Sequence, residues 1–119
     1  MDEAQALAAF LALGQEHRLR LVRALVIAGP EGLASGVLAE AVGVSAATVS
    51  HHLKELSHAG LVASRREGRS IIYSAAYPAL SELVQFLMRD CCQGHPEVCA
   101  PAVEALAGCL CRTGETAHA

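Results

Sequence analysis

The sequence predicts a mainly α-helical domain that carries a small β-hairpin. Of the 119 residues, 53% are apolar but only 3% are aromatic, so we expect a core of Leu, Val, Ile and Ala, which favours packed helices. Apolar residues recur at spacings of three and four through most of the chain, as on one face of a helix. Residues 61–75 differ, because two short runs that favour strands flank the sequence REGR.

Two helices are expected at the N-terminus, over residues 3–13 and 16–28, with Gly14 between them. The second helix should be buried, since its apolar residues form a broad face: Leu19, Leu21, Val22, Leu25 and Val26. The sequence AGPEG is expected to end it, because Pro and Gly both interrupt helices.

Ser35 is expected to cap a short helix over residues 36–42, and GVS then makes a tight connection to a longer helix. Ser45 suits the N-cap of that longer helix, and Gly60 suits the position just after its end. His52 lies at the edge of its apolar face, which consists of Val49, Leu53 and Leu56.

A hairpin and a last long helix are expected next. The strands should cover Leu61–Arg65 and Ser70–Ala75, with a tip at Glu67–Gly68. Pro78 lies in the first turn of the last helix, where Pro is tolerated. The apolar residues of this helix recur at helical spacing: Leu80, Leu83, Val84, Leu87, Met88 and Cys91. Residues 100–111 are expected to form one more short helix.

Length and composition indicate one main domain, residues 1–92, followed by an extension, residues 93–119. The chain opens with MDEAQALAAF, which has no basic segment before an apolar one, so we expect no signal peptide. Its apolar runs end well short of the ~18 residues that a membrane span needs, so the expected location is the cytoplasm. Cysteines are reduced there, and clustered cysteines then indicate metal binding or reactivity before disulfides.

The charges are unevenly distributed along the chain. The net charge of the whole chain is −3, but the segment Ser45–Ile72 has a net charge of +2 and holds three of the six histidines. A basic stripe on an acidic body is typical of a nucleic-acid interface.

Helix, short helix, tight turn, helix and basic hairpin is the order of a winged helix-turn-helix. The helix that begins after Ser45 would enter the major groove of double-stranded DNA as the recognition helix. Its polar residues are predicted to meet the DNA, with groups that donate and accept hydrogen bonds: Ser45, Thr48, Ser50 and His51. The cationic residues are predicted to contact phosphates: Lys54, Arg65, Arg66 and Arg69. The plainer alternative is a solvated helix followed by an ordinary hairpin.

The sequences FLALGQEHRLRLVRALV and LAEAVGVSAATVSHHLKELSHAGLVASRREGRSIIYSA closely resemble the ArsR/SmtB family of winged-helix metalloregulators, over about Leu7 to Met88. The resemblance implies a homodimer built through the first and last helices. It also implies a repressor that binds operator DNA and releases it when a metal ion binds. The dimer interface would contain Leu7, Leu11, Leu80, Leu83, Val84 and Leu87. The alternative for the leucines of the last helix is a core face within one chain.

The sequence RDCCQGHPEVC, residues 89–99, carries the candidate effector site. Many family members have a Cys-x-Cys site in the short helix before the recognition helix, but GVLAEAVGV contains no Cys. Others bind zinc through Asp and His pairs on the last helix, where this chain has Leu, Val and Met. Cys91, Cys92 and Cys99 instead resemble the site of members that sense trivalent arsenic.

The chemistry of the three thiols agrees with this resemblance. Arsenic(III) is a soft centre that takes three thiolates in a pyramid, and soft centres select thiolates. Antimony(III) and methylarsenite are further candidate effectors, and no organic cofactor is expected. Zinc, cadmium or lead on the same cysteines with His95 is an alternative, although structural zinc sites usually space their cysteines two to four residues apart.

Other interpretations of the cysteines also remain open. Clustered thiols can form a redox switch, and Cys91 alone can be inert packing. A Cys–His enzyme is disfavoured, because the sequence shows neither a base nor an oxyanion pocket beside a thiol. Cys109 and Cys111 form a second pair, which fits either a weaker soft-metal site or small residues on a short helix.

Overall fold

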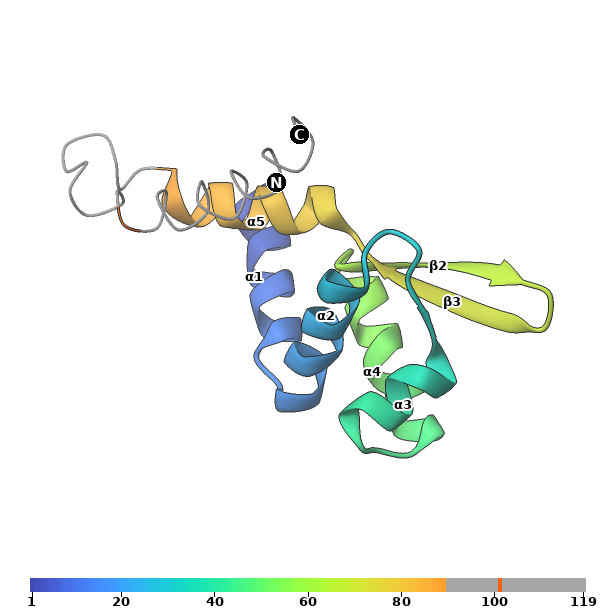
Figure 1. Ribbon diagram of the computed structural model, residues 1–119. Coiled ribbons are helices and arrows are strands. Elements are labelled where there is room, and N and C mark those ends of the chain that lie inside the picture. The colour runs from blue at the N-terminus through green and yellow to red at the C-terminus, as the bar shows by residue number, and fades with distance from the viewer. Residues whose placement is uncertain (90–100, 102–119) are drawn as a thin grey trace. The chain divides into compact units, whose positions relative to one another are not determined.

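The computed structural model describes residues 1–89 and residue 101. The chain divides into two compact units, Met1–Phe86 and Leu87–Ala119. The described elements, in chain order, are α1 (Glu3–Leu13), α2 (Glu16–Ala28), β1 (Leu33–Ala34), α3 (Ser35–Val42), α4 (Ala46–His58), β2 (Val62–Glu67), β3 (Ser70–Ala75) and α5 (Tyr77–Met88) (Figure 1). The domain boundary predicted after residue 92 lies outside the described residues, as does the helix predicted over residues 100–111 apart from residue 101.

The first two helices have the predicted bounds, and side-chain caps explain where they begin. The Gln5 amide donates to Asp2 Oδ1 at 2.8 Å, and the Asp2 amide donates to Gln5 Oε1 at 2.8 Å, which makes a capping box for α1. The Arg18 amide donates to Gln15 Oε1 at 2.9 Å and caps α2. Both helices therefore begin where a local side chain satisfies the first free amides.

The helix-turn-helix consists of α3 and α4. Gly43 ends α3 in the left-handed conformation, and its amide donates to the Ala39 carbonyl at 2.8 Å. The predicted N-cap of α4 is confirmed, since the Thr48 amide donates to Ser45 Oγ at 3.2 Å. The predicted cap of α3 is wrong, because that helix already begins at Ser35 and has Ala34 at its N-cap. Ala34 is held extended by its pairing in β1, which starts the helix one residue early.

The three strands form an antiparallel sheet in the order β1-β3-β2. The predicted hairpin is confirmed, and Figure 1 shows it projecting from the helices. Its turn lies one residue later than expected: Glu67 pairs with Ser70, so Gly68 and Arg69 form the tip. The sequence did not indicate β1, because a two-residue strand has no periodicity of its own.

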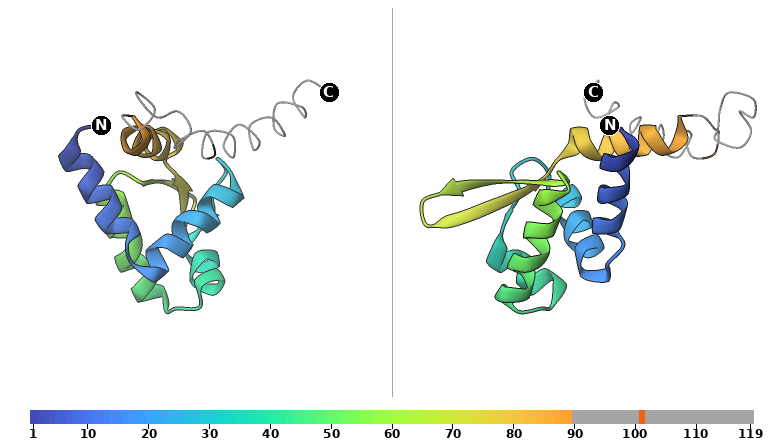
Figure 2. Two further views of the ribbon diagram at one scale, coloured as in Figure 1. Left: turned by 90° about the vertical axis from the view of Figure 1, so that its left-hand side faces the viewer. Right: turned by 180° about the vertical axis from the view of Figure 1, so that it is seen from behind.

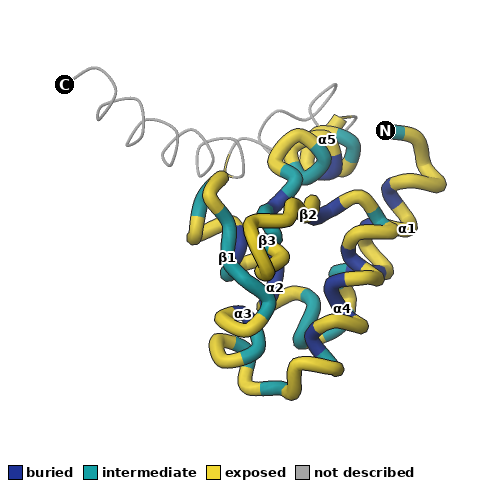
Figure 3. The backbone as a smooth tube through the Cα atoms, turned by 90° about the vertical axis from the view of Figure 1, so that its right-hand side faces the viewer, coloured by how far each residue is buried: buried dark blue, intermediate teal, exposed yellow. Residues whose placement is uncertain are grey.

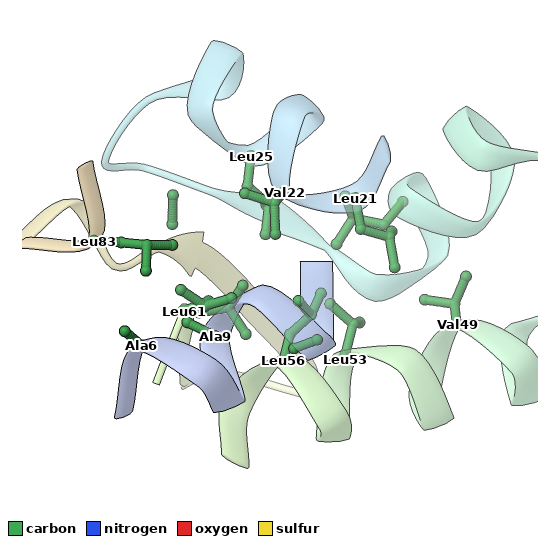
Figure 4. Close-up of a cluster of buried hydrophobic side chains, with 14 residues drawn as sticks. Ala6, Ala9, Leu21, Val22, Leu25, Val49, Leu53, Leu56, Leu61 and Leu83 are labelled. Atoms are coloured by element: carbon green, nitrogen blue, oxygen red, sulfur yellow. The ribbon is translucent and has the colours of Figure 1, made fainter. Parts of the chain in front are cut away.

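The core lies where α1, α2 and α4 pack against one another (Figure 2). Side chains from these helices, from α5 and from the segment before β2 converge in it (Figure 4): Ala6, Ala9, Leu21, Val22, Leu25, Val49, Leu53, Leu56, Leu61 and Leu83. Burying one such leucine contributes ~1.5–3 kcal/mol of transfer free energy. Core packing therefore determines which side of α4 remains available to a partner.

The buried side of α2 is narrower than the sequence suggested. Leu21, Val22 and Leu25 are buried, but Leu19 and Val26 are 47% and 43% exposed. The neighbouring elements cover only the side of the helix that carries the first three residues, whereas helical spacing alone treats all five alike.

Candidate DNA interface

The start of α4 presents polar side chains on the side away from the core. Val49, His52, Leu53 and Leu56 are buried, whereas Ser45, Ser50, His51 and Lys54 are exposed, and Thr48 is half-buried. Figure 3 shows this mixture of buried and exposed positions along α4. An exposed polar face on the second helix of a helix-turn-helix is the surface that enters a major groove in proteins of this fold.

Two hydroxyls are organised at the beginning of this face. Ser45 Oγ donates to Thr48 Oγ1 at 2.9 Å while it accepts the Thr48 amide. Thr48 can then donate its own hydroxyl hydrogen outward, and the exposed Ser50 hydroxyl and His51 ring can donate or accept. These groups have the chemistry required to read base edges.

The hairpin of β2 and β3, which we call the wing, carries three exposed arginines. Arg65 and Arg66 follow one another in β2 and so point to opposite faces of the sheet, whereas Arg69 lies in the turn. Across the strand pair, Arg66 lies opposite Ile71. Within the described part of the chain, neither Arg66 nor Arg69 forms an ion pair.

Arg65 is already engaged within the chain. Its Nε donates to Glu67 Oε2 at 2.6 Å, and its Nη2 donates to the Glu31 carbonyl at 2.6 Å. This arginine ties the wing to the loop between α2 and β1. Sequence reasoning grouped it with Arg66 and Arg69, because the contact to Glu31 is not visible in the local pattern.

A polar cluster lies between α2 and α4, on the side of α4 opposite its exposed polar face. Arg18 Nη1 lies 3.5 Å from His52 Nδ1, and Arg18 Nε donates to the Ala12 carbonyl at 2.6 Å. The His17 and His52 rings are 5.5 Å apart, and Gln15 Nε2 lies 3.2 Å from His17 Nδ1. The sequence placed His52 at the edge of the core but did not indicate Arg18 as its partner.

The environment of His52 favours its neutral form. Burial, which desolvates the charged ring, is the main cause that lowers the pKa of His52 below its ordinary value of 6.5. The positive charge of Arg18 lowers this pKa further, as do His17 and His51, while Glu55 acts in the opposite direction. A neutral ring can accept a hydrogen bond at Nδ1 from the arginine.

The leucines predicted at a dimer interface differ in exposure. Leu7, Leu11, Val84 and Leu87 are 55%, 75%, 43% and 62% exposed, and Leu80 is half-buried. Leu83 is only 4% exposed, because it packs in the core of its own chain. Phe10, on α1, is a further exposed apolar residue that the prediction did not include.

All five cysteines lie outside the described residues: Cys91, Cys92, Cys99, Cys109 and Cys111. Among residues 1–89 and 101, no group of three or more His, Cys, Asp or Glu side chains is arranged to hold a metal ion. The same part of the chain contains no helix long and apolar enough to cross a membrane.

The chain is similar in sequence to known transcriptional regulators. A family model described as a helix-turn-helix domain matches residues 13–65. The HTH-type transcriptional regulator YgaV of Escherichia coli (strain K12) is 31% identical over 85 residues, which cover 71% of this chain and 86% of YgaV. The cadmium resistance transcriptional regulatory protein CadC of Listeria innocua is 38% identical over 64 residues, which cover 54% of this chain and 52% of CadC.

The chain is also similar in fold to solved structures of transcriptional regulators. An ArsR-like transcriptional regulator from Rhodococcus sp. RHA1 superposes with a TM-score of 0.67 at 28% identity, over 87% of this chain and 93% of that one. The homodimeric winged helix-turn-helix DNA-binding domain of Mb0332 from Mycobacterium bovis, a possible ArsR-family regulator, gives a TM-score of 0.61 at 25% identity. That match covers 77% of this chain and 83% of the other.

The fold and the polar, cationic surface define a winged helix-turn-helix protein of the DNA-binding class. The chain belongs to the ArsR/SmtB family of helix-turn-helix transcriptional regulators. It is accordingly a regulator that acts by binding DNA and not an enzyme.

Proposed function

We propose that this protein is a homodimeric, cytoplasmic repressor that binds an operator and releases it when trivalent arsenic binds Cys91, Cys92 and Cys99. Two copies of α4 would enter successive major grooves, roughly 34 Å apart, over a near-palindromic site. The observation that carries the effector assignment is the sequence: three thiols lie within residues 91–99, and α5 ends at Met88.

The DNA contacts follow from the exposed residues of α4 and the wing. In this proposal Ser45, Thr48, Ser50 and His51 face the base edges, and Lys54, Arg66 and Arg69 contact phosphates. Arg65 also lies on the wing, but its guanidinium is engaged by Glu67 and the Glu31 carbonyl. We therefore assign it a smaller share of the phosphate contacts and a larger share in holding the wing.

The dimer would be built from α1 and α5. Leu7 and Leu11 on α1, and Val84 and Leu87 on α5, expose apolar surface in the single chain, and the related Mb0332 domain is homodimeric. Leu80 would contribute its exposed part. Leu83 would support this surface from the core side, because it is buried within its own chain.

The effector is expected to act through the dimer. Binding beside the end of α5 would change how the two subunits meet and so misplace the recognition helices. The coupling between effector and DNA is typically ~1–3 kcal/mol, and DNA must weaken effector binding by the same factor. Antimony(III) has the same preference for thiolates and is expected to act similarly.

A second candidate effector is a soft divalent ion. The similarity to CadC, whose name associates it with cadmium resistance, favours this alternative. Zinc, cadmium or lead would use the same three cysteines with His95 as a fourth ligand.

The test is a titration of DNA binding by fluorescence anisotropy, with the full chain under reducing conditions. The labelled duplex carries the promoter upstream of the protein's own gene, and arsenite, antimonite, zinc, cadmium and lead are added separately. We expect arsenite and antimonite to release the DNA and zinc to leave it bound. Release by zinc or cadmium alone supports the second candidate, and release only by an oxidant assigns the thiols to a redox switch.

Cysteine variants test which thiols bind the effector. Cys99→Ser should keep its affinity for DNA but lose its response to arsenite, whereas the matched control Cys111→Ser should respond as the wild type does. Methylarsenite has fewer positions to exchange and should need only two of the three thiols. A Cys99→Ser protein that releases DNA normally with arsenite overturns the three-thiol site.

A further inference from the structure

The guanidinium of Arg18 joins three parts of the fold. Its Nε donates to the Ala12 carbonyl at 2.6 Å, near the end of α1, and its Nη1 lies 3.5 Å from His52 Nδ1 on α4. Its own backbone amide is held by Gln15 Oε1 at 2.9 Å, at the start of α2. One side chain thus connects the α1–α2 junction to the middle of the helix whose other side is exposed.

The geometry of this contact requires an arginine and a neutral histidine. A guanidinium presents several N–H groups in a rigid plane, so two of them can point to acceptors on different elements at once, whereas a lysine has a single ammonium group. His52 accepts at Nδ1 only when that nitrogen carries no proton, which assigns its single proton to Nε2. Protonation would turn an N–H toward the arginine and place two positive charges side by side.

We propose that Arg18 is a positioning residue for DNA recognition, which holds neutral His52 and thereby α4 in its binding orientation, so that acidification weakens sequence-specific binding. The inference rests on the proposed role of α4 as the recognition helix. His51, which the proposed function places at the DNA, immediately precedes His52 in the chain. A shift of His52 therefore moves a base-reading side chain directly.

The cluster reaches the surface of the chain at Arg18. A hollow of about 270 Å³ lies beside Arg18, between α1 and α4, and is also lined by Glu55 and His58. The charges that act on His52 come from Arg18 and His17 on α2 and from His51 and Glu55 on α4. Arg18, His17 and His51 lower the pKa of His52 and only Glu55 raises it, so the site opposes a positive charge on His52.

Two variants of the full chain separate the two halves of the proposal. Arg18→Lys keeps the positive charge but cannot span both acceptors. We expect about a tenfold loss of affinity for the operator, with little change for unrelated duplex, because phosphate contacts remain. His52→Asn keeps an acceptor near the position of Nδ1 and cannot be protonated there. At about pH 8 it should bind like the wild type, and as the pH falls below about 6.5 it should bind increasingly more tightly than the wild type.

Matched controls lie on the same helices. Arg20→Lys alters an exposed arginine of α2 that pairs with Glu16, and His58→Asn alters an exposed histidine of α4. Both should retain wild-type affinity and pH dependence. Thermal unfolding of every variant confirms that the proteins compared are folded.

The outcomes are distinguishable. An Arg18→Lys protein with unchanged operator affinity, or with equal losses for operator and unrelated DNA, overturns the positioning role. A His52→Asn protein that follows the wild-type pH profile overturns the acid dependence. A wild type that binds no duplex overturns the proposed function itself, and with it this inference, whatever the variants do.

Discussion

Ser45 supplies the hydroxyl on which the first turn of α4 depends. It accepts the Thr48 amide and donates to the Thr48 hydroxyl. His52, two turns along, is held by Arg18 on the core side. At the scale of single residues, these two contacts fix where the helix begins and how it is seated, which are the properties that a DNA-reading helix requires.

We expect Ser45→Ala to lower the free energy of unfolding by ~1 kcal/mol, because the Thr48 amide loses its acceptor. Ser57→Ala, at an exposed position of the same helix, should change stability by less than about 0.5 kcal/mol. Urea unfolding followed by circular dichroism measures both. Equal effects of the two substitutions would show that the cap does not stabilise α4.

Stability should also fall in acid because of His52. Its pKa in the folded chain lies below 6.5, mainly through burial, so the unfolded chain binds the proton more readily. The contribution of neutral His52 to the free energy of unfolding is therefore fully present above the ordinary pKa of 6.5 and is lost as the pH falls below it. We expect the thermal midpoint of the wild type to drop over this range more than that of His52→Asn. Parallel curves for the two proteins would contradict this expectation.

At the scale of elements, the wing is fastened to the helical part of the chain at its base. Gly32, just before β1, has φ +75°, and an added Cβ would lie 2.1 Å from the Tyr73 carbonyl oxygen of β3. Arg65 of β2 holds the same loop through the Glu31 carbonyl. Because Gly32 has no Cβ, its backbone can lie close to Tyr73, which permits β1 to join the sheet. The hydrogen bond of Arg65 further attaches β2 to the loop before β1.

Gly32→Ala should destabilise the fold by more than Gly29→Ala. Both residues have a positive φ, but an added Cβ at Gly29 meets nothing within 4 Å. The control should cost ~1–3 kcal/mol from backbone strain alone, and Gly32→Ala should exceed it because β1 must also move. Denaturant unfolding of both variants provides the comparison. Similar losses would mean that the contact with Tyr73 is easily relieved.

The exposed arginines of the wing should set the salt dependence of DNA binding. Arg66→Gln and Arg69→Gln should each weaken binding and reduce the slope of log affinity against log salt by about one, because one phosphate contact is lost. Arg20→Gln, on α2, should leave the slope unchanged. Anisotropy titrations at several salt concentrations measure it. A slope that stays constant in both wing variants would remove the wing from the DNA interface.

At the scale of the whole molecule, apolar residues are exposed both on the helices that we assign to the dimer and elsewhere on the described chain. Leu11 and Leu87 lie on the helices that we assign to the dimer, and they are 75% and 62% exposed. Ile27, at the end of α2, is 80% exposed but lies outside that assignment. Single exposed apolar residues are normal on protein surfaces, so substitution must show which of these residues a second copy covers.

Leu11→Glu should convert the dimer to monomers, because it would bury an unpaired carboxylate in the interface. A cost of ~3 kcal/mol raises the dimer dissociation constant by roughly a hundredfold. Ile27→Glu is the matched control and should remain dimeric. Sedimentation velocity at several concentrations distinguishes the two results. A Leu11→Glu protein that stays dimeric would exclude Leu11 from the interface.

Much of the fold could be predicted from local sequence alone. The bounds of α1 and α2, the Ser45 cap, the buried face of α4 and the hairpin each depend on residues within a few positions of one another. The predicted cap at Ser35 was wrong and β1 was missed for one reason: Leu33–Ala34 is extended only because it pairs with residues 72–73 of β3.

The candidate site likewise has a part that local sequence predicts and a part that depends on distant contacts. The polar residues at the start of α4 and the basic residues of the wing could be predicted from local composition, because their exposure does not depend on a contact with a distant part of the chain. The engagement of Arg65 by the Glu31 carbonyl and the approach of Arg18 to His52 each join residues 34 positions apart in the chain. The burial of Leu83 likewise depends on which elements cover α5.

The sequence by itself therefore determined the class of this protein, through helical periodicity, caps and a local excess of positive charge. The tertiary structure decided which apolar residues are buried, which arginines are free to meet a phosphate, and what holds the recognition helix behind its exposed face. The physical reason is that periodicity and capping act within a few residues, whereas burial and long-range hydrogen bonds exist only after distant segments have packed together.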